Sequence, residues 1–169
     1  TARLRLRFPD ILLVVAGEGP ARAHLKRLAR ELGIESNVHF VGYLQRGPDL
    51  WDCYAAGRAF VFASTTETQG LVLLEALVLG VPVVGVPALG ARDVLIDGEG
   101  ALTTAAEAGP FAAAVERLLR DADLREELSQ KAQAYAQRWS NAIMCERLVG
   151  IYRGMIEARA EGRQVLEGI

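Results

Sequence analysis

Two glutamates with seven residues between them stand where a polar segment meets an apolar one. Glu67 lies in the polar stretch 64–70, and Glu75 lies in the stretch 71–79, whose other residues are Leu, Val and Ala. If 70–79 forms a helix, its free N–H groups and its dipole suit a phosphate at the N-terminus. A carboxylate in the second turn can accept hydrogen bonds from hydroxyl groups. The pattern is compatible with a ligand that carries both phosphate and hydroxyls.

Each glutamate also has a plainer interpretation. A carboxylate on a helix that is apolar almost all round is costly unless it has partners. Those partners could belong to a ligand, or they could be an Arg or a backbone N–H of the fold itself, and the residues leave both open for Glu75. Glu67, taken alone, fits a solvated loop carboxylate.

The elements that must position these residues follow from the apolar pattern. A strand over 59–63 leads into the polar loop, Gly70 permits a close backbone approach, Thr68 is a candidate N-cap, and Gly80 ends the helix. Short apolar runs separated by helical stripes predict an α/β fold with a mostly parallel sheet. A buried parallel strand is expected at 11–16, because its apolar run does not alternate with polar residues, and further strands at 38–41, at 81–86 and near Ala101. A Gly-rich loop is expected around Gly90. The further helices are expected at 20–32, 48–56 and from 107 to 160, with breaks near Asp121 and Ser140.

Length and charge set wider limits. The 169 residues fit one domain, and a net charge of −2 gives no indication of nucleic acid binding. Cys53 and Cys145 lack metal-ligand spacing, so we expect two buried free thiols in a reducing compartment. The longest apolar run, 71–84, is too short and too interrupted to span a bilayer. We therefore expect a cytoplasmic protein.

Three smaller patterns have more than one interpretation. Residues 1–8 alternate Arg with apolar residues, which fits either a strand with one charged face or the last turn of a helix. Asp121-Ala122-Asp123 imitates a metal-binding motif, but its place between two helices favours a cap. His39, inside a strand, is expected to pack in the core, and His24 to face solvent.

The sequence resembles glycosyltransferase family four, whose members have the GT-B fold of two Rossmann-like domains. The resemblance starts with Glu67, Gly70, Leu71, Glu75, Ala76 and the Gly80-Val81-Pro82-Val83-Val84 that ends the helix. It extends to the strand and loop over 13–20, to 38–42, to Gly90 and 93–98, and to Tyr135, Trp139, Ser140 and Tyr152. It covers residues 8–157 and implies the C-terminal, donor-binding domain of such an enzyme, over residues 1–160 with a polar tail at 161–169.

The resemblance implies roles for individual residues. Glu75 would bind the ribose hydroxyls of a nucleotide sugar, and Glu67 would contact the donor sugar as the catalytic residue. The backbone of Gln69, Gly70 and Leu71 would face the sugar and diphosphate. The loops after two other strands would border the nucleotide: Gly42, Tyr43 and Leu44 at the base, and Gly17 and Gly19 beside it.

The resemblance also implies chemistry and partners. The donor is expected to be a UDP-sugar, the transfer of a hexose to retain configuration, and neither metal nor other cofactor to be needed. Gln69 within Thr-Glu-Thr-Gln-Gly-Leu is similar to the branch that glucosylates diacylglycerol lipids, which leaves open a lipid acceptor and peripheral membrane association. The residues expected of a first strand and helix, with a phosphate-binding Arg and Lys, are not matched.

We therefore expect a chain truncated at its N-terminal end and inactive without an N-terminal acceptor domain. The absent first strand would leave an open sheet edge, filled by residues 1–8 as a strand, by a partner chain, or by domain swapping in a homodimer. Two other functions stay open: a GT-B nucleotide-sugar epimerase or phosphorylase-like enzyme, and a non-catalytic nucleotide-binding interaction domain.

Overall fold

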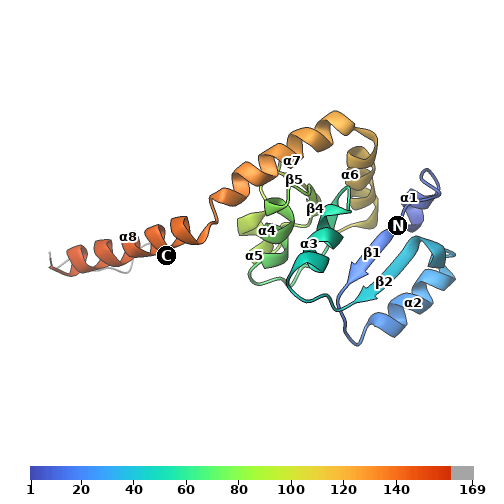
Figure 1. The fold of residues 1–169 in the computed structure, drawn as a ribbon, viewed down its shortest axis with the longest axis horizontal. Helices are drawn as coiled ribbons and strands as arrows, with labels where there is room; N and C mark the ends of the chain where they lie inside the picture. Colours follow the sequence, from blue (N-terminus) through green and yellow to red (C-terminus); the bar gives the residue numbers. More distant parts are fainter. Residues whose placement is uncertain (161–169) are drawn as a thin grey trace.

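The structure is a computed structural model, and it describes residues 1–160. Helices and strands alternate as far as β5, and from there to residue 160 the elements are helices alone (Figure 1). The elements are α1 (Ala2–Arg5), β1 (Leu13–Ala16), α2 (Arg22–Glu31), η1 (Glu35–Asn37), β2 (Val38–Gly42), α3 (Pro48–Ala55), β3 (Phe60–Phe62), α4 (Leu71–Val78), β4 (Val83–Gly85), α5 (Gly90–Val94), β5 (Ala101–Thr103), α6 (Ala108–Arg120), α7 (Ala122–Gln137) and α8 (Asn141–Ala160).

A parallel sheet of β3, β4 and β5 carries the main core. β4 lies in the middle, with Val83 paired to Phe60 on one side and to Ala101 on the other. Because successive residues of a strand point to opposite faces, Val83 packs with α4, α5 and α7, and Val84 packs with α6. Both valines are fully buried. A parallel sheet with helices on both faces confirms the expected α/β class.

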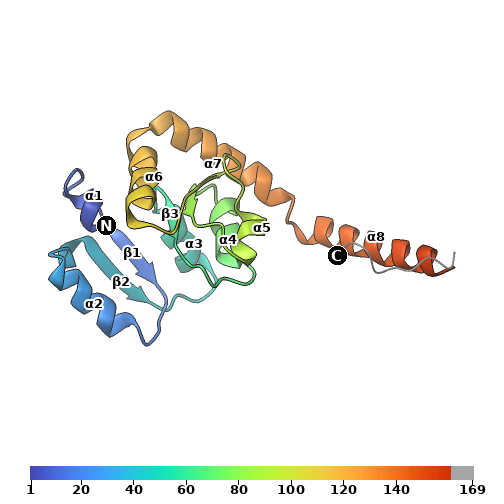
Figure 2. The ribbon, with the colours of Figure 1, turned by 180° about the vertical axis from the view of Figure 1, so that it is seen from behind.

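A second parallel sheet holds only β1 and β2 and lies beside the first (Figures 1 and 2). In the described residues β1 pairs with β2 alone and β3 with β4 alone, so each keeps one edge without ladder hydrogen bonds. The prediction that β1 is buried is wrong, because Val14 is 42% exposed. Two strands with α2 on one side are too few elements to cover both faces, and Leu25 of α2 and Leu32, the residue after it, stay exposed as well.

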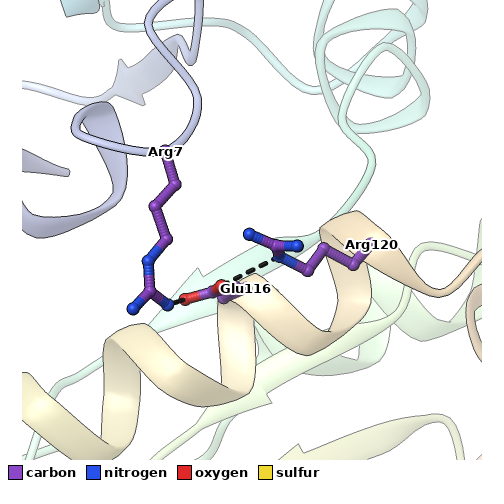
Figure 3. Close-up of polar contacts among 3 residues, drawn as sticks. All are labelled: Arg7, Glu116 and Arg120. Atoms are coloured by element: carbon purple, nitrogen blue, oxygen red, sulfur yellow. Dashed lines mark hydrogen bonds and ion pairs between the residues drawn. The ribbon is translucent and has the colours of Figure 1, made fainter.

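Residues 1–8 do not fill the open edge as a strand. Ala2–Arg5 form α1, so the helical alternative is confirmed and the strand alternative is wrong. After α1, Arg7 pairs with Glu116 of α6, which also accepts a hydrogen bond of 2.9 Å from Arg120 Nε (Figure 3). The Arg120 guanidinium lies over the Phe8 ring, 5.6 Å from its centroid. These contacts fix the start of the chain against α6.

Helix ends agree largely with the turn chemistry of the sequence. Asp121 Oδ1 accepts a hydrogen bond of 2.8 Å from Leu124 N, so the predicted cap of α7 is confirmed. Gly80 follows α4 with a φ of 70°, in the left-handed region that favours glycine. The stretch around Gly90, expected as a loop, instead begins α5.

The last helix, α8, projects away from the other elements (Figures 1 and 2). Several of its apolar side chains are exposed, among them Leu148, Ile151, Tyr152, Met155 and Ile156. None of the helices within residues 1–160 is both long and apolar enough to cross a membrane. The polar tail expected from Glu161 lies outside the described residues.

Three burial predictions are wrong and one is confirmed. Cys145 is exposed and Cys53 only partly buried, because α8 leaves the core and α3 covers it from outside. His39 is exposed, since its side of β2 carries no covering element. His24 faces solvent as predicted.

Candidate functional site

The loop between β3 and α4 is organised by the Glu67 carboxylate. Its Oε1 accepts hydrogen bonds from three consecutive backbone N–H groups, at 3.1 Å from Thr68, 3.0 Å from Gln69 and 3.1 Å from Gly70. Gly70, with a φ of 68°, is the residue that caps α4. Thr68 makes no side-chain cap bond, so its predicted role as N-cap is wrong: Glu67 binds these N–H groups instead.

The same contacts stabilise the charged form of Glu67. The backbone N–H groups of Gln69 and Gly70 lower the pKa of this carboxyl below its ordinary value of 4.5; desolvation opposes them, and the Thr68 N–H adds a weaker lowering effect. Glu67 is therefore an anion, held at the end of α4 where the helix dipole is positive.

Two further backbone donors lie at this helix end. Within residues 1–160 the N–H groups of Leu71 and Val72 have no hydrogen-bond acceptor, as expected for the first turn of a helix. The Leu71 side chain is 51% exposed, and the Gln69 side chain also faces solvent. The end of α4 is thus an open surface with unpaired donors, the arrangement that binds anions at helix N-termini.

Glu75 lies one turn further along α4, and its side chain is only 17% exposed. Its Oε1 accepts hydrogen bonds from Arg46, at 3.2 Å from Nε and 2.5 Å from Nη2, and its Oε2 accepts one of 3.1 Å from Tyr54 Oη. Of the interpretations that the sequence left open, pairing with an Arg of the fold is present in this structure. Arg46 is 69% exposed, so this partner can move away without leaving a cavity.

The loops after β1 and β2 meet beside one another. Gly17 donates its N–H to the Gly42 carbonyl, at 2.7 Å, and both glycines have a positive φ that only glycine adopts freely. Tyr43 is 71% exposed, Leu44 is partly exposed, and Gly19 lies in open surroundings. Because Arg46 follows in the same loop and reaches Glu75, the loop of Gly42, Tyr43 and Leu44 is tied to α4.

Sequence reasoning missed three residues of this region. Arg46 and Tyr54 contact Glu75, and Gly90 packs on the Glu67 loop, with its N–H donated to the Glu67 carbonyl at 2.9 Å. A Cβ on Gly90 would lie 2.1 Å from the Thr68 carbonyl oxygen, so no side chain fits there. A glycine was visible at this position, but nothing in the sequence indicated which loop it approaches.

The site combines an anion-binding helix end with a half-buried carboxylate at the carboxyl ends of parallel strands, where open α/β sheets bind ligands. Two surface hollows lie away from these residues, one beside the end of α2 and one beside the first turn of α7. In the described part of the chain, no three His, Cys, Asp or Glu side chains gather closely enough to hold a metal ion. That the reaction needs no metal stays a prediction.

A family model and the sequence relatives all indicate a glycosyltransferase family. The model of the family described as glycosyl transferases group 1 matches residues 1–135. The alpha-D-kanosaminyltransferase of Streptomyces kanamyceticus is 33% identical over 158 residues, which cover 90% of this chain and 40% of that protein. A D-inositol 3-phosphate glycosyltransferase of Acidothermus cellulolyticus is 35% identical over 156 residues, or 88% of this chain and 34% of that protein.

Solved structures agree with the sequence relatives. The HepE protein of Anabaena, crystallised in complex with UDP, is 27% identical, with a TM-score of 0.71 over 84% of this chain and 42% of that one. The same protein in complex with UDP-glucose gives a TM-score of 0.73 over the same shares of the two chains. The chain thus spans about two fifths of the length of these relatives.

Proposed function

The chain belongs to the glycosyl transferases group 1 family, and on that premise we propose that it binds the nucleotide-sugar donor, a UDP-sugar, of a hexosyltransferase. The observation that carries the proposal is the placement of Glu75, a half-buried carboxylate one turn from a helix end with unpaired N–H groups. A nucleoside diphosphate sugar offers hydroxyls to the Glu75 carboxylate and phosphate to the N–H groups at the helix end. A relative solved with UDP and with UDP-glucose supports the choice of uridine.

Each part of the donor has a counterpart in the site. The ribose hydroxyls would donate to Glu75 after Arg46 yields its place, and the diphosphate would accept hydrogen bonds at the start of α4, from the backbone of Gln69, Gly70 and Leu71. The base would lie against the loop of Gly42 and Tyr43, with Gly17 and Gly19 bordering the nucleotide. The exposed Tyr43 ring offers a face on which a base can stack.

Glu67 would act at the sugar end of the donor. Its carboxylate accepts hydrogen bonds from the N–H groups of Gln69 and Gly70, so the diphosphate would either meet the remaining donors of Leu71 and Val72 or replace Glu67. A carboxylate released in this way would be free to contact the sugar. Donor binding at the helix end and the placement of Glu67 are then one coupled event.

The glycosyl transfer also involves features outside the donor site. We propose that configuration is retained, that no metal is needed, that the acceptor is bound by a separate N-terminal domain, and that Gln69 marks an acceptor of lipid character at a membrane surface. Stabilisation of the leaving diphosphate by the α4 dipole and N–H groups is the contribution of this domain to the reaction.

Calorimetric titration of the intact protein with UDP, GDP and ADP tests the donor site. We expect UDP to bind with preference over the other two, and Glu75→Ala to lower UDP affinity by about tenfold or more, because hydrogen bonds to a charged group contribute about 1.5–3 kcal/mol. Glu127→Ala is the matched control, since within residues 1–160 Glu127 pairs only with Lys131, on the surface of α7. Equal UDP affinity in the wild type and Glu75→Ala would refute the proposed site, and preference for another nucleotide would refute the choice of uridine.

A further inference from the structure

The two partners of Glu75 differ in how firmly the fold holds them. Tyr54 lies on α3 with its ring 5.3 Å from that of Phe60 in β3, and it packs against the main core. Arg46 lies in the loop before α3 and is 69% exposed, and Glu75 is its only hydrogen-bond partner within residues 1–160. One partner is therefore fixed and the other is free to leave.

The two partners also occupy different oxygens. Tyr54 Oη donates to Oε2 at 3.1 Å, and Arg46 donates to Oε1. Burial, together with the negative charge of Glu75, raises the pKa of Tyr54, so its hydroxyl stays protonated and acts as a donor at physiological pH. If Arg46 leaves, the carboxylate keeps its rotamer, because the hydrogen bond to Tyr54 persists.

We propose that Tyr54 is a positioning residue for donor recognition: it fixes the Glu75 carboxylate so that Oε1, released by Arg46, faces the ribose hydroxyls. Arg46 is the exchangeable partner, which neutralises the carboxylate until the nucleotide arrives. The inference rests on the proposed donor site and adds the residues that set its preference for ribose. On binding, the ribose hydroxyls would replace Arg46 at Oε1, while Tyr54 keeps its hydrogen bond to Oε2.

The positioning role of Tyr54 is tested by the ratio of the affinities for a ribose and a deoxyribose nucleotide. In calorimetric titrations of the intact protein we expect UDP to bind more tightly than 2′-deoxy-UDP. We expect Tyr54→Phe to reduce that preference by about three- to tenfold, the size of an ordinary net hydrogen bond, because Tyr54 acts on the ligand only through Glu75. The variant keeps the ring that packs on Phe60. A role in packing alone would weaken both ligands equally, and that result would overturn the inference.

Two further variants show through which residue Tyr54 changes the ribose preference. In a Glu75→Gln background Tyr54→Phe should change the preference little, because the partner through which it acts is altered; a change as large as in the wild type would overturn the inference. Arg46→Gln is expected to keep the preference, and a loss equal to that of Tyr54→Phe would show that Arg46 does the positioning. Tyr152→Phe, on the exposed α8, is the matched control.

These outcomes separate the inference from the proposed function. A wild-type protein that binds UDP while Tyr54→Phe leaves its ribose preference unchanged would refute the positioning role alone. A wild-type protein that binds no uridine nucleotide would refute both.

Discussion

Gly90→Ala is expected to displace the loop that carries Glu67. A Cβ on Gly90 would lie 2.1 Å from the Thr68 carbonyl oxygen, 2.3 Å from its carbonyl carbon and 2.8 Å from Gln69 N. These are backbone atoms, which cannot rotate away as the end of a side chain can. Restoring an ordinary contact of 3.4 Å requires a shift of about 1.3 Å in the loop or in α5.

The shift has two measurable effects. Overpacking of this kind costs about 1–3 kcal/mol, which for a chain of this size lowers Tm by roughly 3–9 °C. A loop moved by about 1 Å also misplaces the N–H groups at the start of α4, and such a misplacement can cost up to a hundredfold in function. We expect the affinity for UDP to fall by about tenfold or more.

Differential scanning calorimetry and UDP titration of the same samples test both effects. Gly109→Ala in α6 is the matched control, because the nearest atom to its Cβ would be Arg3 Nη1 at 3.9 Å, and we expect stability to be unchanged or slightly raised. If Gly90→Ala matches the wild type in both Tm and UDP affinity, then Gly90 does not support the loop and the close approach described above is not the native one.

Two further predictions concern single hydrogen-bonded groups. The pKa of Glu67 is lowered by its backbone N–H partners. The stability that these hydrogen bonds contribute is therefore present above the ordinary value of 4.5 and is lost as pH falls through the lower folded-state pKa. An NMR titration that follows the amide of Gln69 should give a midpoint below 4.5, and a midpoint at or above this value would contradict the hydrogen bonds to Glu67. Asp121→Ala removes the cap of α7 and should lower the free energy of unfolding, measured by urea denaturation, by about 1 kcal/mol. Asp123→Ala, in the first turn of the same helix, should lower it by less. Equal losses in the two variants would argue against the cap.

The sequence predicted the elements well where the pattern was long or the turn chemistry specific. Gly80 and Asp121 ended and capped helices as expected, because their local geometry follows from backbone sterics and a short side chain. Thr68 failed as a cap although it is a suitable residue, because α4 begins at Leu71 with Gly70 at its N-cap, two positions later than expected. The Gly70 N–H, within reach of a cap at Thr68, binds the charged carboxylate of Glu67 instead. Local propensity does not rank two such competitors.

Burial and partnership were less predictable than element type. Val14 and His39 lie in strands whose residues are apolar enough for a core, yet both are exposed because too few elements cover the small sheet. Glu75 was identified as the residue in need of partners, but Arg46 and Tyr54 come from a loop and a helix that precede it by more than twenty residues. Contacts of this kind depend on how elements are placed in space, which no periodicity in the sequence specifies.

The division of the strands into two sheets has a consequence for how the domain opens. Within residues 1–160 no ladder hydrogen bond joins the β1–β2 sheet to the β3–β5 sheet. The two sheets can therefore act as separate cooperative units, with β1 and β2 exchanging their amide protons through local opening at a cost well below the global free energy of unfolding. The Arg46–Glu75 pair reaches from the loop after β2 to α4. A nucleotide that lies against that loop and α4 would bridge the two units and protect β2 from exchange, although it contacts none of the ladder hydrogen bonds of that strand.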